Sequence, residues 1–281
     1  MAAVSATKVE SAKRAACQQA VADNFKPEFK YVGIGSGSTV AYVVAAIAGL
    51  GPSVTGSMKF VPTGSGSTNL IRDAGLTVLQ VPDLLAEVQS TPNSSRQYID
   101  IYFDGADEVD NELTCIKGGG ACLFQEKVVS RLSKQFVCVA DSRKRVDRLL
   151  TAWKYIPIEV SPTAAELVRQ SLLDLGAVSP VIRTAGPTYT YAITDNHNYI
   201  IDAPFKTLLL NSESDKMDPK NGVWTPDALG REIRGILGVL EVGIFGGLNG
   251  PQAASKGPHV EGVKPVKVYF GNADGSTETL S

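Results

Sequence analysis

Short apolar runs alternate with helix-like segments along the first half of the chain, and this alternation constrains the fold more than any other feature. The predicted strands are 31–34, 59–61, 77–81, 98–103 and 136–140, and the predicted helices are 10–24, 40–48, a short one from 69, and 121–134. Strands separated by helices in this way predict an α/β fold with a parallel, doubly wound sheet. Their content of Val, Ile, Phe and Tyr is typical of the buried middle of such a sheet.

The pattern changes after about Trp153. Strands are predicted at 155–160, near 181–183, and at 189–194, 199–202 and 239–245, together with two helices, at 162–175 and from Thr225 with Pro226 at its first position. These elements indicate a smaller α+β domain, and they are followed by a Gly/Pro/Asn-rich loop at 246–257 and a strand at 266–270. We therefore expect an α/β domain at 1–152, an α+β domain at 153–245, and a C-terminal segment at 246–281 that returns to the first domain.

Composition narrows the classes of function. The chain has 27 Lys and Arg against 29 Asp and Glu and no basic block, which gives no electrostatic support for nucleic-acid or membrane-surface binding. Its longest apolar run, 40–50, is too short to span a bilayer, and the N-terminus lacks the apolar core of a secretory signal. The four cysteines show neither a C-x-x-C pair nor zinc spacing, so we expect reduced thiols in a cytoplasmic protein. Two histidines argue against a His-based triad or metal site.

An acidic turn and a lysine–glycine segment carry the strongest chemical signal. Asp104 and Asp107 follow the predicted strand 98–103, where the carboxyl end of a strand borders the ligand crevice of an open α/β sheet. The segment 117–120, Lys-Gly-Gly-Gly, then lets the backbone approach a ligand closely. Together they predict a small anionic substrate with carboxylates beside it to move protons. A Mg²⁺ site stays open as an alternative, as does an acidic capping turn with Glu108 and Asp110 in solvent.

The pentapeptide Gly-Ser-Gly-Ser-Thr occurs twice, at 35–39 and at 64–68. The first copy lies between a strand and a helix, where orphan N–H groups at a helix N-terminus bind phosphate. It matches neither the dinucleotide-binding fingerprint nor a P-loop, so a capped turn is an equal alternative. For the second copy we expect a role in shaping the pocket or the turn.

The remaining candidates are weaker. On periodicity alone Glu126 lies off the apolar stripe of its helix, which predicts a surface side chain. The cations of 141–145 follow another strand, and one of them could reach an anion in the crevice. His197 lies between two predicted strands and is interpreted as a turn residue.

Taken together, these segments resemble the A type of ribose-5-phosphate isomerase, particularly its eukaryotic forms. The matching segments are 32–39, 104–110, 117–127, 139–144, 194–202 and 238–245. The resemblance implies a Rossmann-like domain with a second, ferredoxin-like α+β domain, no cofactor and no metal. It also implies reversible conversion of ribose 5-phosphate to ribulose 5-phosphate in the non-oxidative pentose phosphate pathway.

The resemblance also implies roles for single residues. Glu126 matches the catalytic base, and Asp104, Asp107 and Lys117 match polar residues of the active site. The matching substrate-binding residues are Ser36, Gly37, Ser38, Thr39, Asp104, Gly105, Ala106, Asp107, Lys117, Gly118, Gly119, Gly120 and Lys144, and Lys13 can correspond to an N-terminal lysine near the phosphate. The chain departs from the family pattern at 64–68 and in the stretch 246–263, which we interpret as a surface insertion.

Two other functions stay open at this point. One is a sugar-phosphate sensor without turnover, although the first 30 residues leave no room for a DNA-binding module. The other is a transferase with a glutamate nucleophile on a similar sheet. For the isomerase we expect a homodimer or homotetramer.

Overall fold

The computed structural model describes residues 6–89, 96–186, 190–257 and 259–281. Contacts within the chain divide it into two compact units. Unit 1 consists of 1–106, 125–144 and 247–281, and unit 2 consists of 107–124 and 145–246. The domain assignment at 1–152, 153–245 and 246–281 differs in where it puts 107–124, 145–152 and Gly246, and it stays a prediction.

The sheet of unit 1 is mostly parallel, as predicted. It contains six strands in the order β15-β14-β6-β3-β1-β2. These are β1 (Tyr31–Ile34), β2 (Lys59–Pro62), β3 (Ile101–Asp104), β6 (Phe136–Asp141), β14 (Lys267–Gly271) and β15 (Thr277–Leu280). All neighbours pair in parallel except β14 and β15, which are antiparallel. Parallel strands that end at one edge bring their following loops together there.

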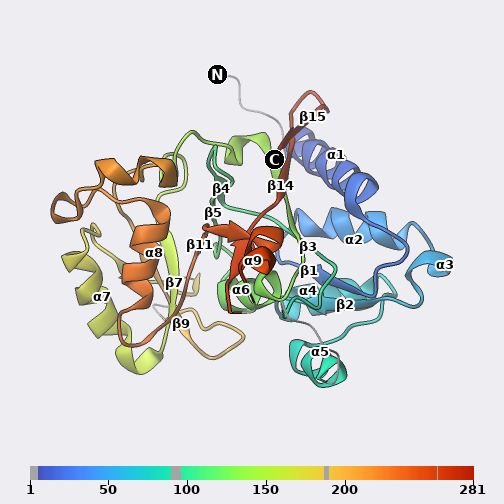
Figure 1. Cartoon of the computed structure of the whole chain (residues 1–281), viewed down its shortest axis with the longest axis horizontal. Coiled ribbons are helices and arrows are strands. Elements are labelled where there is room, and N and C mark those ends of the chain that lie inside the picture. The colour runs from blue at the N-terminus through green and yellow to red at the C-terminus, as the bar shows by residue number, and fades with distance from the viewer. Residues whose placement is uncertain (1–5, 90–95, 187–189, 258) are drawn as a thin grey trace. The chain divides into compact units, whose positions relative to one another are not determined.

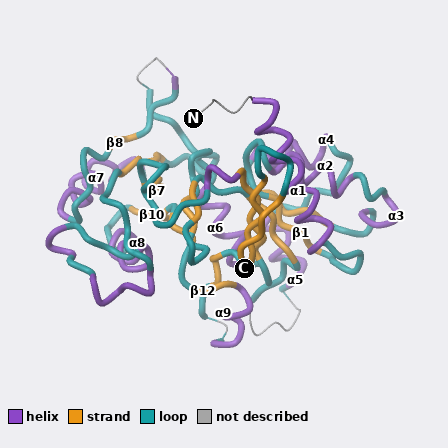
Figure 2. The backbone as a smooth tube through the Cα atoms, turned by 90° about the horizontal axis from the view of Figure 1, so that it is seen from above, coloured by secondary structure: helices purple, strands orange, loops and turns teal. Residues whose placement is uncertain are grey.

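Helices cover both faces of this sheet (Figures 1 and 2). On one face, α1 (Ala6–Asn24) and α2 (Val40–Ala48) bury Cys17 and Val43 against Val32 and Ile101 of the strands. On the other face α6 (Leu123–Arg131) approaches Gly33, where a Cβ would lie 2.8 Å from both the Tyr102 ring and Val129. The remaining elements of unit 1 are α3 (Pro52–Thr55), α4 (Ser65–Asp73), α5 (Val81–Val88), α9 (Gly250–Lys256), β12 (Leu248–Asn249) and β13 (Gly262–Lys264).

Unit 2 is an α+β unit, also as predicted. Its antiparallel sheet has the order β10-β7-β9-β8, formed by β7 (Ile156–Val160), β8 (Val181–Ile182), β9 (Tyr199–Ala203) and β10 (Val239–Val242). Helices α7 (Ala165–Asp174) and α8 (Pro226–Arg234) share a core with the alternate residues Ile156, Ile158 and Val160 of β7 (Figure 1). A second sheet joins β4 (Glu108–Val109), β5 (Cys115–Ile116) and β11 (Ile244–Phe245).

The second Gly-Ser-Gly-Ser-Thr segment is a helix start and not an open loop. Helix α4 begins at Ser65, four residues before the predicted start. The hydroxyls of Ser67 and Thr68 donate to the Gly64 carbonyl at 3.1 and 2.9 Å, and both side chains are buried. The same residues that signal a turn thus stabilise the first turn of a helix here.

The predicted loop at 246–257 is also wrong, because it contains α9. Asn249 caps this helix by accepting from the N–H of Gln252, whose side chain accepts from the N–H of Asn249 in return. This reciprocal capping box, with Pro251 in the first turn, fixes the helix start. The segment is not a simple surface loop either, because a Cβ on Gly250 would lie 2.2 Å from the Lys134 carbonyl oxygen.

Three predicted strands also differ in the structure. Residues 77–81 form only a single bridge, from Val78 to Phe60, before α5 begins. The predicted strand 189–194 lies partly outside the described residues, and its described part forms only single bridges. The strand 239–245 is interrupted at Gly243, where a Cβ would lie 2.2 Å from the Lys117 carbonyl oxygen.

Candidate functional site

Asp104, at the end of β3, has a fully buried carboxylate that accepts hydrogen bonds from neighbouring groups of unit 1. Its Oδ1 accepts from the backbone N–H of Ser36 at 3.1 Å and of Gly105 at 2.7 Å. Its Oδ2 accepts from the phenol of Tyr102. Gly35 leaves the necessary room, since a Cβ there would lie 1.9 Å from both Cγ and Oδ1 of Asp104. The carboxylate is therefore fixed against the first Gly/Ser loop.

Tyr102 is a site residue that the sequence analysis missed. Its side chain is fully buried and its ring lies 4.8 Å from that of Phe136. Burial raises the pKa of Tyr102 well above its ordinary value, and the negative charges of Asp104 and Glu126 raise it further. Tyr102 therefore stays protonated and remains a donor. The sequence did contain one indication of its role. Tyr102 lies two residues before Asp104, and alternate residues of a strand share one face of the sheet.

Glu126 lies in the first turn of α6 and is 4% exposed. The surface position predicted from periodicity is wrong. The buried side of α6 includes Leu123, Val129 and Ser130, whose hydroxyl donates to the Val263 carbonyl at 3.2 Å. The apolar periodicity of α6 did not reveal this buried side, because one of its contacts is polar and is made with a residue 133 positions further along the chain. Unit 1 thus holds a second buried carboxylate, whose charge acts on Tyr102.

The loop 35–39 contains both fixed and exposed parts. Gly35 is buried and its N–H donates to the Phe103 carbonyl at 2.9 Å, whereas Gly37 and Ser38 are exposed. Gly37 has a φ of +97°, which favours glycine. The hydroxyls of Ser36 and Thr63 lie 2.9 Å apart, so the residue before the second Gly/Ser segment supports the first loop. The exposed part precedes the N-terminus of α2, which is suited to an anion.

Lys13 of α1 lies at this loop. Its Nζ donates to the Ser38 hydroxyl at 3.1 Å and to Glu10 at 2.8 Å. Glu10 also accepts from the Tyr42 phenol at 2.6 Å. The hydrogen bond from Lys13 is the main reason that the pKa of Glu10 lies below its ordinary value. The structure therefore places the charge of Lys13 at the exposed end of the loop.

Asp141 is the last residue of β6, and the cations Arg143 and Lys144 come after it. Asp141 is buried, and its Oδ1 accepts from Arg143 Nε at 2.6 Å. Burial raises the pKa of Asp141, but the Arg143 hydrogen bond and the charges of Arg143 and Lys144 outweigh it, so the pKa lies below its ordinary value. Arg143 is thus bound to Asp141, and Lys144, which ends the 3-10 turn Ser142–Lys144, is partly exposed.

In unit 2, Asp107 is bound to the glycine segment. Its Oδ2 accepts from the N–H of Gly119 at 2.7 Å, and a Cβ on Gly119 would lie 2.7 Å from Oδ1. The turn is closed by the N–H of Ala121, which donates to the Gly118 carbonyl at 3.0 Å. Gly118 has a φ of +105°, and a Cβ there would lie 2.7 Å from the Leu123 side chain. Both glycines are therefore required by the packing of this turn.

Lys117 is held by its backbone and by an aromatic ring. Its N–H donates to the Gly243 carbonyl at 2.9 Å, and its Nζ lies 5.5 Å from the centroid of the Phe245 ring. The side chain is 3% exposed. An ammonium over an aromatic face in a desolvated place is stabilised by the ring quadrupole. The Nζ of Lys117 therefore lies against an aromatic face and out of contact with bulk solvent.

Arg183, directly after β8, is the second residue that the sequence analysis missed. Its Nε and Nη2 donate to the two carboxylate oxygens of Asp202 at 2.8 and 2.5 Å. Its Nη1 donates to the carbonyls of Gly118 and Gly119 at 3.1 and 3.0 Å. No local pattern identifies it, because the carbonyls lie more than 60 residues earlier in the chain.

Glu108 and Asp110 were expected in solvent, and this expectation is wrong, because both are fully buried. Glu108 accepts from four consecutive backbone N–H groups, at residues 150–153, over 2.5 to 3.1 Å. Asp110 accepts from the N–H of Glu112 and of Thr114. The partners of Glu108 lie about 40 residues ahead, so its role is to fix a distant loop.

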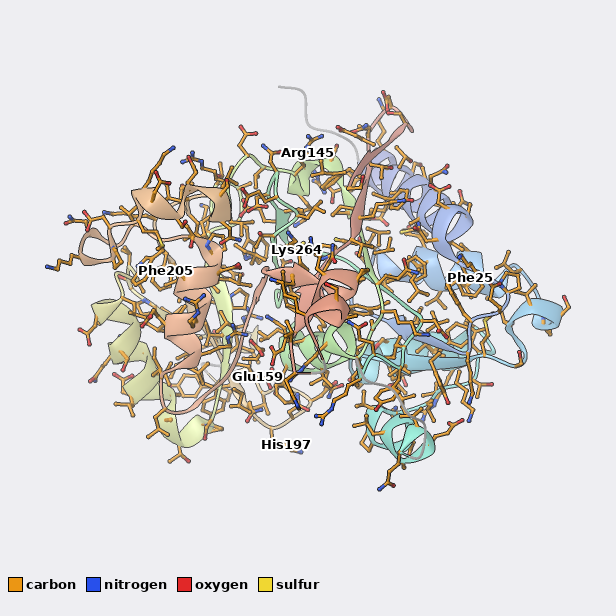
Figure 3. The ribbon with its side chains drawn as sticks, in the orientation of Figure 1. Phe25, Arg145, Glu159, His197, Phe205 and Lys264 are labelled. Atoms are coloured by element: carbon orange, nitrogen blue, oxygen red, sulfur yellow. The ribbon has the colours of Figure 1, made fainter. Side chains whose placement is uncertain are left out.

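His197 is a turn residue, as predicted. It is exposed and has a φ of +62°, within the turn that joins Thr194 to Asn198. The turn is fastened by Glu159 of β7, whose Oε1 accepts from Thr194 and Asn198 at 2.9 Å each. Glu159 and His197 are labelled in Figure 3. His197 therefore has a conformational role in unit 2.

The predicted site residues fall into both units. Unit 1 contains Ser36, Gly37, Ser38, Thr39, Asp104, Gly105, Ala106, Glu126 and Lys144, and unit 2 contains Asp107, Lys117, Gly118, Gly119 and Gly120. Hydrogen bonds join Ser36 and Gly105 to Asp104, and Gly119 to Asp107. Within the part of the chain that the structure describes, no group of three or more His, Cys, Asp or Glu could hold a metal ion. No helix there has the length and apolar character to cross a membrane.

Comparison with known proteins identifies relatives over most of the chain. The model of the family Ribose 5-phosphate isomerase A (phosphoriboisomerase A) matches residues 59–253. The ribose-5-phosphate isomerase of Mycosarcoma maydis is 41% identical over 269 residues, covering 95% of this chain and 80% of that protein. The ribose 5-phosphate isomerase A structure from Methanocaldococcus jannaschii has a TM-score of 0.73 and 28% identity, over 97% of this chain and 99% of that chain. A D-ribose-5-phosphate isomerase solved with phospho-erythronic acid has a TM-score of 0.74 and 27% identity over the same shares.

Proposed function

We propose that this chain, which belongs to the ribose 5-phosphate isomerase A family, interconverts D-ribose 5-phosphate and D-ribulose 5-phosphate through an enediolate. The observation that carries the proposal is the pair of buried carboxylates in unit 1, Asp104 and Glu126. Both act electrostatically on the phenol of Tyr102, and Asp104 is also bonded to the loop 35–39. Buried carboxylates beside an anion-binding loop suit proton transfer on a phosphorylated sugar.

Glu126 is the proposed base. Its carboxylate removes the proton from C2 of the open-chain aldose, the C–H electron pair forms the C1–C2 double bond, and the C1 carbonyl oxygen becomes an oxyanion. A proton passes from the C2 hydroxyl to that oxygen, and Glu126 returns its proton to C1, which leaves the carbonyl at C2. A carboxylate base of this kind contributes about 10²–10⁴-fold in rate.

The other residues have supporting roles in this proposal. Asp104 assists ring opening, Asp107 orients hydroxyls, and Lys117 offsets the charge of the oxyanion. The phosphate and hydroxyl groups are bound by Ser36–Thr39, by the backbone of 105–106 and 118–120, and by Lys144. The positive charge of Lys13 on the Ser38 hydroxyl supports the placement of the phosphate at the first loop. Binding of the phosphate positions the reacting carbons.

The relative that was solved with phospho-erythronic acid gives independent support for this substrate class. That ligand is a phosphorylated four-carbon acid, and its carboxylate resembles an enediolate in being planar and negatively charged. A protein that binds it must accept a phosphate at one end and a delocalised anion at the other. We propose the same two requirements for this chain.

The decisive experiment replaces Glu126 by Gln. We expect kcat for ribose 5-phosphate to fall by about two to four orders of magnitude, because the base is lost while the shape is kept. Binding of ribose 5-phosphate, measured by calorimetry, should stay within about threefold, since binding depends on the loops. Glu261→Gln is the matched control, because Glu261 is an exposed carboxylate of unit 1 that pairs with Arg131.

Exchange of the C2 hydrogen in D₂O separates the isomerase from the other two functions. Only the isomerase exchanges this hydrogen without a second substrate, and Glu126→Gln should abolish the exchange. Near-normal turnover in this variant would contradict the role of Glu126. The absence of exchange in the wild type would contradict the function itself. The assay should run in EDTA, because we propose no metal or other cofactor, and activity restored only by Mg²⁺ would overturn that part.

We also propose a homodimer or homotetramer in the cytoplasm. Exposed apolar side chains on unit 2, among them Val181 and Ile193, support an interface between copies. The four cysteines all lie in the described residues and none forms a disulfide, which supports a reducing compartment. Light scattering after size exclusion tests the oligomer, and fractionation of cells tests the compartment.

A further inference from the structure

We propose that Arg183 is a positioning residue for the isomerase reaction, and that it acts on Asp107 through the peptide group between Gly118 and Gly119. The inference rests on the proposed function, in which Asp107 orients the hydroxyls of the substrate. All the groups involved belong to unit 2. The inference gives a role to a partly buried arginine that lies 66 residues beyond the lysine of the glycine segment.

The guanidinium of Arg183 divides its donors between two partners. Nε and Nη2 form the bidentate pair with Asp202, which fixes the plane of the group. Nη1 is left facing the glycine turn, and it donates to both the Gly118 and the Gly119 carbonyl. The side chains of Arg183 and Asp202 are only 16% and 12% exposed, so solvent screens this pair weakly.

The peptide geometry transmits this contact to Asp107. No described peptide bond is cis, and in a trans peptide the C=O and N–H groups point in opposite directions. Because Arg183 holds the Gly118 carbonyl, the N–H of Gly119 points away from Arg183, and it donates to Asp107 at 2.7 Å. The Gly119 carbonyl is held on the same side, so the N–H of Gly120 also points away. Two consecutive amides then present partial positive charge to the side of Asp107.

The electrostatics agree with this chain of contacts. Burial lowers the pKa of Arg183, but the hydrogen bonds and charge of Asp202 outweigh burial, with a smaller contribution from Asp107, so the pKa lies above its ordinary value. The guanidinium is therefore always charged. A charged donor polarises the carbonyl of the 118–119 peptide and thereby strengthens its N–H as a donor to Asp107.

Lysine cannot replace this arginine. An ammonium group can pair with Asp202, but it lacks the planar fork that reaches a carboxylate and two carbonyls at once. The variant Arg183→Lys therefore keeps the charge that Asp202 needs and removes the hold on the glycine turn. This separates the positioning role from the stability of the partly buried ion pair.

The test compares Arg183→Lys with Arg169→Lys as the matched control. Arg169 also forms a bidentate pair, with Glu166 on the surface of α7, but it contacts no residue of the glycine turn in the hydrogen bonds of the described residues. We expect Arg183→Lys to lower kcat/KM for ribose 5-phosphate by about 10- to 100-fold, because a charge-assisted hydrogen bond is lost and Asp107 is misplaced. Arg169→Lys should stay within about twofold of the wild type.

A double-mutant cycle with Asp107→Asn distinguishes positioning from a general loss of structure. If Arg183 acts through Asp107, then adding Arg183→Lys to Asp107→Asn should cost less than about threefold further. The inference would be overturned if the losses in kcat/KM of the two single variants multiplied in the double variant. It would also be overturned if kcat/KM of Arg183→Lys stayed within about threefold of the wild type.

Hydrogen exchange gives a readout that does not need activity. In Arg183→Lys the amides of 118–121 should exchange at least about tenfold faster, while those of β7 and β9 keep their rates. Unchanged exchange in the turn would overturn the inference even if activity fell. If the wild type shows no isomerase activity, the proposed function fails, and this measurement still decides whether Arg183 holds the turn.

Discussion

Tyr102→Phe tests a fully buried contact of the candidate site. The substitution removes one oxygen and keeps the ring that packs 4.8 Å from Phe136, so it creates almost no cavity. It removes the donor from Oδ2 of Asp104, and both side chains are fully buried. The carboxylate keeps its bonds to the N–H groups of Ser36 and Gly105 through the other oxygen. The variant therefore isolates the phenol–carboxylate bond.

The expected magnitudes follow from that bond. A hydrogen bond to a charged group contributes about 1.5–3 kcal/mol to the free energy of unfolding. At about 2–4 °C per kcal/mol for a domain of this size, the melting temperature should fall by about 3–12 °C. If the same bond holds Asp104 in place for ring opening, kcat/KM should fall about 10- to 100-fold, since about 1.4 kcal/mol is tenfold in rate.

Tyr269→Phe is the matched control. Tyr269 is also buried in the sheet of unit 1, and its phenol donates to a carboxylate, Asp23, at 2.9 Å. Asp23 is exposed, so water replaces the lost donor, and we expect a smaller effect on stability and none on kcat/KM. Melting curves and steady-state kinetics on both variants measure the difference. The reasoning is refuted if the two variants lose the same stability and both keep full activity.

Two further predictions concern protonation. Burial raises the pKa of the Cys17 thiol to about 12, whereas Cys122 is partly exposed, so Ellman's reagent at pH 8 should label Cys122 first; a fast phase that persists in Cys122→Ser would contradict this. Asp141 has a pKa below its ordinary 3.8 because Arg143 outweighs burial, so its contribution to stability is present above about pH 4 and is lost as the pH falls through the folded-state value. In denaturant unfolding, the free energy of unfolding of Asp141→Asn should therefore be lower than that of the wild type by up to about 1 kcal/mol at pH 6, and by less at pH 3. The effect is small because Arg143 is 62% exposed. A difference that grows towards pH 3 would contradict the prediction.

The elements that the sequence predicts best are those whose partners are all apolar. Strand 31–34 and helix 40–48 have the predicted bounds, because each has a continuous apolar pattern bounded by turn residues. The elements around Gly, Ser and Pro were harder to assign. The segment 64–68 has the composition of a loop, yet Ser67 and Thr68 stabilise a helix start by bonding to the Gly64 carbonyl. Composition alone cannot separate these two uses of a hydroxyl.

The site residues divide in the same way. Gly119 and Asp107 lie 12 residues apart, and their association could be inferred from a short segment. The burial of Glu108 could not, because its partners are backbone amides about 40 residues away, and neither could Arg183, whose partners lie 64 and 65 residues back. Long-range polar contacts have no periodicity in the sequence. They follow only from the three-dimensional path of the chain.

The position of β14 has a consequence for synthesis on the ribosome. Its partner in the sheet, β6, ends at Asp141, but residues 267–271 of β14 are added only after all of 145–246. Until then the open edge of β6 exposes unpaired N–H and C=O groups, which are a template for pairing with other chains. N-terminal domains usually fold first as the chain emerges from the ribosome. Unit 1, however, cannot complete its sheet until unit 2 has been synthesised. All residues of unit 2 are synthesised before those of β14. Unit 2 can therefore fold while the sheet of unit 1 still lacks this strand.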